Sequence, residues 1–114
     1  MLNQSTVLDL TFQALADPAR RAMLERLSRG PAAVSELAQP LTMSLPAVLQ
    51  HLTVLENAGL VTSAKTGRVR TCQLGGPALA VAEGWLNARR AEWEARFDRL
   101  EAYLNDMKEE DQHG

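Results

Sequence analysis

The chain has 114 residues, 46% of them apolar and 23% charged, with a formal net charge of −2 at pH 7. This length predicts one domain, residues 1–107, followed by a polar tail at 108–114, and the apolar content suffices for an ordinary core. A single cysteine excludes an internal disulfide framework. No apolar run is long enough to span a membrane and no signal-peptide pattern is present, so we expect a cytoplasmic protein without membrane partners.

The first strong helix signal after the N-terminal segment begins at Asp17. This residue is a good N-cap, Pro18 suits a first helical turn, and Gly30-Pro31 ends the helix at about residue 29. Arg20 and Arg21 lie near its start. A structural pairing, for example with an acidic neighbour, is favoured for them over a contact with phosphate.

Residues 33–58 predict two helices joined by a tight turn. Val34 and Leu37 give a short amphipathic helix, and Pro40 prevents the following turn from staying helical. Ser44 is a suitable N-cap for the second helix, and Gly59 ends it where a left-handed backbone is tolerated. Two helices connected in this way form a helix-turn-helix.

The two faces of the second helix differ in character. One face carries an apolar stripe that requires a core, formed by Val48, Leu52 and Leu55. The opposite face is small or polar and lacks the charges usual on a solvated helix; it carries Pro46, Ala47, Gln50 and Thr53. A helix with such an outer face can lie against another surface, and the DNA major groove is wide enough to admit it.

Residues 60–74 predict a two-stranded ribbon. The segments 60–65 and 68–74 are rich in Val and Thr and flank a turn at Thr66-Gly67. Lys65, Arg68 and Arg70 cluster near its tip. One interpretation is a solvated edge ribbon whose charges block strand pairing. Beside a helix-turn-helix, we favour a wing that contacts phosphate.

The charge is divided unevenly along the chain. Residues 18–82 carry a net charge of +4, whereas residues 1–17 carry −2 and residues 83–114 carry −4. The basic middle and acidic ends reconcile a negative total with binding of a polyanion by the middle segment.

A long helix at 77–107 is predicted by apolar residues that recur every seven positions, with further apolar residues beside them: Leu79, Leu86, Trp93, Leu100 and Met107, then Phe97 and Leu104. One interpretation is packing within the chain. We favour a two-fold dimer, with an N-terminal helix completing the interface. The expected interface residues are Leu8, Phe12, Leu15, Leu86, Trp93, Phe97, Leu100 and Leu104.

Four segments in order resemble the ArsR-type (arsenical-resistance repressor-like) winged helix-turn-helix transcriptional regulators: residues 12–21 (FQALADPARR), 34–38 (VSELA), 44–61 (SLPAVLQHLTVLENAGLV) and 67–70 (GRVR). The resemblance implies a mainly α fold with a β-hairpin wing and terminal dimerisation helices. It also implies a homodimeric repressor that binds double-stranded DNA at a near-palindromic operator. Many relatives have a small hydroxyl residue where this chain has Leu49, so an apolar contact with a thymine methyl is expected there.

The expected DNA-binding residues combine the second helix and the wing: Ser44, Pro46, Ala47, Leu49, Gln50, His51, Thr53, Lys65, Arg68 and Arg70. His51 lies on the shoulder of this helix, where a structural or phosphate-contacting role is favoured over metal ligation.

Metal-sensing relatives carry cysteines in the first helix of the motif or His and carboxylate ligands in the last helix. Here residues 33–38 read AVSELA, and the last helix has no histidine before His113. We therefore expect no metal, no cofactor and no catalytic site, with any small-molecule effector unknown. Two alternatives stay open: a thiol-based redox-responsive regulator using Cys72, whose pKa Arg70 could lower, and a winged-helix interaction module that has lost DNA binding. For Cys72 itself, a small buried residue is favoured over a reactive thiol.

Overall fold

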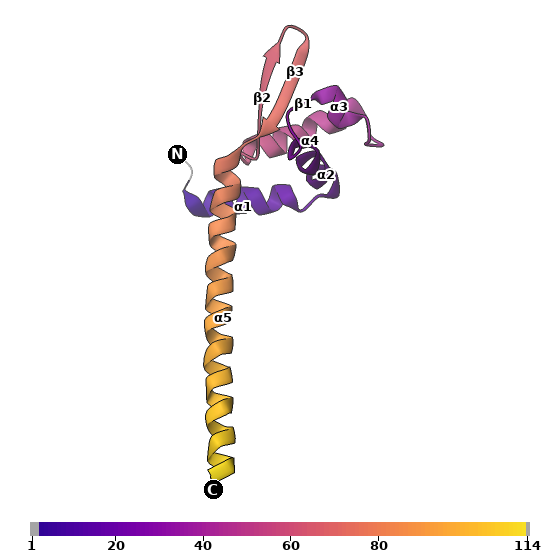
Figure 1. Cartoon of the computed structure of the whole chain (residues 1–114). Helices are drawn as coiled ribbons and strands as arrows, with labels where there is room; N and C mark the ends of the chain where they lie inside the picture. The colour runs from indigo at the N-terminus through magenta and orange to yellow at the C-terminus, as the bar shows by residue number, and fades with distance from the viewer. Residues whose placement is uncertain (1–2, 114) are drawn as a thin grey trace. The chain divides into compact units, whose positions relative to one another are not determined.

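The computed structural model describes residues 3–113, which form five helices and a three-stranded antiparallel sheet of strand order β1-β3-β2 (Figure 1). The elements in chain order are α1 (Gln4–Leu15), α2 (Pro18–Leu27), β1 (Ala32–Ala33), α3 (Val34–Ala38), α4 (Leu45–Asn57), β2 (Val61–Thr66), β3 (Val69–Leu74) and α5 (Gly76–His113). The chain divides into two compact units, one ending at Ala82 and the other starting at Glu83, and α5 contributes to both. The predicted class, mainly α with a β-hairpin wing, is confirmed.

The helix ends follow the capping residues of the sequence. The Asp17 carboxylate accepts hydrogen bonds from the backbone N–H groups of Ala19 and Arg20 at 2.8 and 3.1 Å. The Ser44 hydroxyl accepts one from the N–H of Ala47 at 3.3 Å. Gly59, with φ of +77°, follows the end of α4. These local bonds set where α2 and α4 begin.

The sheet differs from the expected ribbon in two respects. A third strand, β1, pairs with β3 through Ala32 and Ala33, and two residues are too few to give a sequence pattern. The hairpin turn is Gly67-Arg68 rather than Thr66-Gly67, because Thr66 still pairs with Val69. Gly67 has φ of +62°, as the first central residue of a type II′ turn requires, whereas Arg68 does not have a positive φ.

The core of the first unit lies between α4, α2, α3 and the sheet. The apolar stripe predicted on α4 is fully buried, and its neighbours in the core include Met23, Leu27, Leu37, Leu60, Val61 and Cys72. Burial of this stripe fixes the rotation of α4 about its own axis. Its opposite face is therefore left exposed.

Helix α5 begins at Gly76 and continues through residues 108–113, where a polar tail was expected. This expectation was wrong for the described part of the tail. Residues 108–111 are Lys, Glu, Glu and Asp, of which Lys and Glu favour helix, and no glycine or proline lies between Gly84 and residue 114. Residue 114 lies outside the described residues. Among the residues that are described, no helix is sufficiently long and apolar to span a bilayer.

Gly75 joins β3 to α5 and makes a close backbone contact. Its N–H donates to the carbonyl of Leu60 at 2.8 Å, and a Cβ at this position would lie 2.5 Å from the carbonyl oxygen of Gly59. Because the close atoms belong to the backbone rather than to a mobile side chain, no side-chain rotation can make room for a Cβ at this position.

We expect Gly75→Ala to lower the free energy of unfolding by about 1–3 kcal/mol, as overpacking does elsewhere. Gly76→Ala is the matched control, because a Cβ there would meet nothing within 4 Å. Urea unfolding of both variants measures the effect. Equal midpoints for Gly75→Ala and the wild type would contradict the contact.

Candidate nucleic-acid interface

The exposed face of α4 presents apolar and uncharged polar groups. Pro46, Gln50 and Thr53 are exposed on it, as the sequence predicted. The Thr53 hydroxyl donates to the backbone carbonyl of Leu49 at 3.0 Å, so its proton is already used within the helix. Among the described residues, no hydrogen bond occupies the Gln50 amide. Gln50 therefore retains both a donor and an acceptor for a molecule laid against α4.

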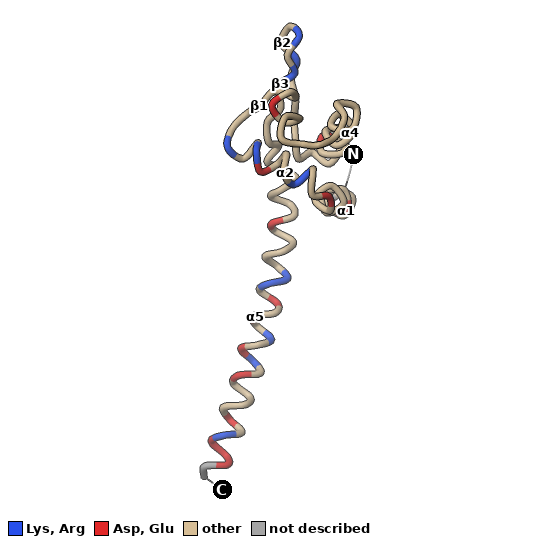
Figure 2. Tube along the Cα trace, turned by 90° about the vertical axis from the view of Figure 1, so that its right-hand side faces the viewer, with Lys and Arg blue, Asp and Glu red and all other residues tan. Residues whose placement is uncertain are grey.

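The hairpin of β2 and β3 carries the cations expected on the wing (Figure 2). Lys65 and Arg68 are exposed, and neither forms an ion pair with another residue of the described range. These two charges are available to an anion from outside the chain.

Arg70 lies differently from the other two wing cations. Its guanidinium binds both carboxylate oxygens of Glu56 on α4, at 2.7 and 3.0 Å, and its Nε donates to the Ser63 hydroxyl at 3.0 Å. The Ser63 hydroxyl in turn donates to Glu56 at 2.9 Å. These bonds connect the hairpin to α4. The positive charge of Arg70 is thus compensated within the protein.

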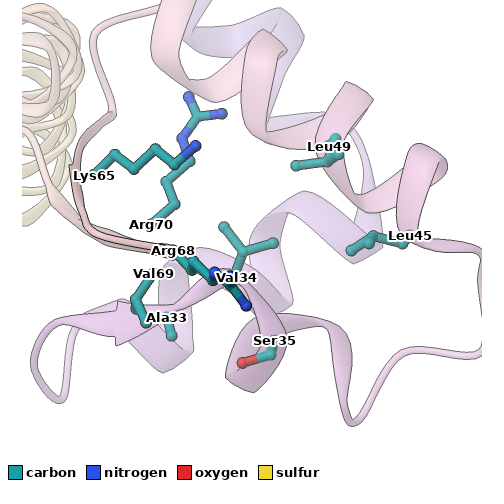
Figure 3. A pocket seen from close by; sticks show the side chains of 9 residues that line it. All are labelled: Ala33, Val34, Ser35, Leu45, Leu49, Lys65, Arg68, Val69 and Arg70. Atoms are coloured by element: carbon teal, nitrogen blue, oxygen red, sulfur yellow. The ribbon is translucent and has the colours of Figure 1, made fainter.

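A hollow of about 410 Å³ lies between the hairpin, α4 and the start of α3 (Figure 3). Its lining combines apolar side chains with the wing cations: Ala33, Val34, Ser35, Leu45, Leu49, Lys65, Arg68, Val69 and Arg70. Leu45 and Leu49 extend from α4 toward this space in Figure 3. The hollow can therefore hold an apolar group beside an anionic one.

Arg20 connects three helices at the other flank of α4. Its Nε and Nη2 donate to the carbonyls of Ala14 and Gln13 at the end of α1, at 2.8 and 3.1 Å. Its Nη1 lies 3.2 Å from Nδ1 of His51. Because a guanidinium can only donate, Nδ1 accepts, and this contact requires that nitrogen to be unprotonated. The structural role expected for Arg20 is confirmed, although its partners are carbonyls and a ring nitrogen rather than a carboxylate.

The backbone N–H of Arg20 holds the pKa of the Asp17 carboxyl below its ordinary value, with further lowering by the N–H of Ala19 and the charge of Arg20. A lowered pKa means that the ionised cap stabilises the fold above pH values near 3.8, the ordinary pKa of aspartate. This stabilisation is lost as the pH falls through the pKa of the folded state. At neutral pH the cap of α2 is therefore charged.

Cys72 is fully buried in β3, between Ala32 of β1 and Ser63 of β2. Burial raises the pKa of the Cys72 thiol, although the charge of Arg70 opposes this shift. The interpretation favoured from the sequence, a small buried residue at Cys72, is confirmed. The alternative, in which Arg70 lowers the thiol pKa, is contradicted because loss of solvent outweighs the charge. The alternative of a thiol-based redox sensor loses its physical basis.

Within the described residues, no three His, Cys, Asp or Glu side chains come close enough together to hold a metal ion. His51 is bound to Arg20, and Cys72 is enclosed by the sheet.

The described part of the second unit is the portion of α5 from Glu83 onward, and the side chains of residues 83–111 are exposed. From Leu86 onward the apolar stripe predicted from the heptads is exposed in the single chain: Leu86, Trp93, Phe97, Leu100, Leu104 and Met107. Leu79, the first residue of that pattern, packs partly against the core of the first unit. Trp93 and Phe97 pack with ring centroids 5.9 Å apart. In the first unit, Phe12 is also exposed, Leu8 is half-buried, and Leu15 packs partly against the core of its own chain.

A short helix, a turn, a second helix with one exposed face and a basic hairpin define a winged helix-turn-helix protein. Residues 17–63 match the model of the bacterial regulatory protein family arsR. The chain is 53% identical over 72 residues to the HTH-type transcriptional regulator Rv2034 of Mycobacterium tuberculosis, covering 63% of this chain and 67% of that protein. It is 30% identical over 57 residues to the transcriptional repressor SdpR of Bacillus subtilis, covering 50% of this chain and 63% of that protein.

The crystal structure of the ArsR family transcriptional regulator RHA00566 superposes with a TM-score of 0.76 at 48% identity, covering 82% of this chain and 97% of that one. The chain therefore belongs to the ArsR family of bacterial regulatory proteins, and it is a DNA-binding transcriptional regulator.

We expect Cys72 to resist oxidation and thiol reagents in the native protein, because its thiol is buried and its raised pKa leaves little thiolate at neutral pH. Mass spectrometry after mild peroxide measures this directly. The same treatment of urea-unfolded chain is the control and should modify the thiol readily. Modification of the native protein at the rate of the unfolded chain would reinstate the redox sensor.

Proposed function

We propose that this chain is a homodimeric repressor that binds a near-palindromic operator in double-stranded DNA and uses no metal effector. The observation that carries the proposal is the exposed, uncharged face of α4, with a free amide at Gln50, beside the two uncompensated wing cations Lys65 and Arg68. An uncharged helix face suits base edges, whereas cations suit the phosphates on either side of a groove.

We assign base contacts to α4 and phosphate contacts to its flanks. Gln50 pairs with adenine, whose N6 and N7 match the amide, and the small or apolar residues around it fill the major groove: Pro46, Ala47, Leu49 and Thr53. Ser44 at the helix start and His51, through its Nε2–H, contact phosphates. Lys65 and Arg68 do the same from the wing, while Arg70 holds the wing against Glu56 rather than contacting DNA.

We assign dimerisation to the apolar stripe of α5, with Leu8 and Phe12 of α1 alongside. Support comes from the exposure of this stripe from Leu86 to Met107 in the single chain, which a soluble monomer rarely tolerates. Aromatic anchors such as Trp93 and Phe97 are favoured in buried interfaces. A two-fold dimer of winged domains places two α4 helices on half-sites about 34–36 Å apart, on successive major grooves.

Repression follows from occupancy, since a dimer bound over a promoter excludes polymerase. The description of SdpR as a transcriptional repressor supports this direction of control. We further propose a cytoplasmic protein without catalytic activity, because the described residues that carry the interface are placed for binding rather than for chemistry.

One test of the proposed function separates base recognition from phosphate contact. Gln50→Ala should weaken binding to the operator by about 1–3 kcal/mol and change binding to random DNA little, because only a matched base uses both groups of the amide. Arg68→Ala should weaken binding to both DNAs by similar factors, since phosphates are independent of sequence. Titrations of both variants on operator and scrambled duplexes measure this.

Gln50 and Arg68 are both exposed, so each variant serves as the folding control of the other. An equal loss for Gln50→Ala on both DNAs would remove base recognition from this residue. If the wild-type protein bound no DNA at all, the alternative of an interaction module without DNA binding would replace the proposal.

Another test concerns dimerisation through α5. Leu100→Glu places a charge within the apolar stripe of α5 and should convert the dimer into a monomer. Operator affinity should fall with it, because one half-site alone provides half of the contacts. Sedimentation at micromolar concentration and operator titration measure the two effects.

Ala102→Glu is the matched control, since residue 102 is exposed and lies on the opposite side of the helix from Leu100. It should leave the dimer intact. A monomeric wild-type protein under the same conditions would overturn the assignment of the interface.

A further inference from the structure

Two large apolar side chains of α4 are exposed, although the other leucines of this helix are buried in the core. Leu45 is 55% exposed and Leu49 is 36% exposed, whereas Leu52 and Leu55 are almost completely buried. Leu45 and Leu49 lie four residues apart and therefore on the same side of the helix. Exposed apolar groups grouped on a binding helix indicate a contact surface.

The polar groups of α4 offer few hydrogen bonds to an incoming base. The Thr53 hydroxyl proton is donated to the carbonyl of Leu49, and the Ser44 hydroxyl accepts from Ala47. Nδ1 of His51 faces Arg20. On the exposed face of α4, the amides of Gln50 and, at the last residue of the helix, Asn57 then keep both a donor and an acceptor free. Hydrogen bonding by two side chains is too little to define an operator half-site.

The surroundings of the two leucines indicate what kind of group they contact. They line the hollow of Figure 3 together with Val34 and Val69, and Lys65 and Arg68 lie on the same lining. An occupant must therefore be apolar where it meets the leucines and anionic where it meets the wing. DNA satisfies both conditions, because the thymine C5 methyl is the apolar group of the major groove and phosphates border that groove.

We propose that Leu45 and Leu49 recognise thymine methyl groups, so that the preferred DNA is a half-site with two thymines near the adenine bound by Gln50. This rests on the proposed function, since it assumes that α4 enters the major groove. Four residues of helix rise about 6 Å, which matches about two base-pair steps. The two thymines should accordingly lie about two steps apart.

The test begins with selection of bound sequences from random duplexes by the wild-type protein. Each thymine of the enriched half-site is then replaced by deoxyuridine, which lacks only the methyl group. Removing a methyl that contacts Leu45 or Leu49 should weaken binding about fourfold per site, the value expected for one buried carbon. Deoxyuridine at thymines outside the half-site should change binding little.

Protein variants complete a double-mutant cycle. Leu49→Ser and Leu45→Ser should each abolish the effect of deoxyuridine at one thymine and leave it at the other. Neither side chain belongs to the hydrophobic core, so both variants should fold like the wild type. Arg68→Ala is the matched control: it should weaken binding but keep the full response to deoxyuridine.

The possible results distinguish this inference from the function on which it rests. If no sequence is enriched, sequence-specific binding itself fails, and recognition of thymine fails with it. If a sequence is enriched but deoxyuridine has no effect, or if the leucine variants keep the full response, recognition of methyl groups is overturned while the proposed regulator stands.

Discussion

Burial of one face of α4 is the constraint on which the remaining structure depends. Val48, Leu52 and Leu55 are enclosed by α2, α3 and the sheet, so the helix cannot rotate without exposing them to water. Exposing three such side chains costs about 1.5–3 kcal/mol each, which is a large share of the stability of a small domain. The outward direction of Gln50 is therefore a consequence of packing on the opposite side of the same helix.

Polar contacts fix α4 at its two flanks. On one side Glu56 binds Arg70 and Ser63 of the hairpin, and on the other side His51 binds Arg20 of α2. These groups are partly exposed, so each contact contributes modestly to stability. These contacts matter for the relative position of the elements, because burial of apolar side chains holds α4 in the core without specifying where the neighbouring hairpin lies. The Glu56–Arg70 pair specifies it.

The sequence predicted the elements that have local signals. Asp17, Ser44 and Gly59 marked helix ends because capping and left-handed backbone depend on single residues, and the buried stripe of α4 followed from its period. The features that the sequence did not predict depend on residues far apart along the chain. Strand β1 consists of two alanines that acquire their structure from β3, and the pairing of Arg70 with Glu56 joins residues 14 positions apart. The enclosure of Cys72 likewise depends on both neighbouring strands of the sheet, and the loss of solvent there outweighs the charge of Arg70 two residues away.

The pairing of Arg70 has a consequence for how the protein moves between DNA sites. Each cation that contacts a phosphate releases about one counterion from the duplex, and this release drives binding to DNA of any sequence. With Arg70 held by Glu56, the wing keeps two uncompensated cations, Lys65 and Arg68, rather than three for the phosphate contacts of the proposed function. Under the proposed function, the missing phosphate contact lowers the affinity for the operator and for random DNA by a similar factor, so the ratio between the two is unchanged. The lower affinity for random DNA shortens the time that the protein spends at each non-specific site.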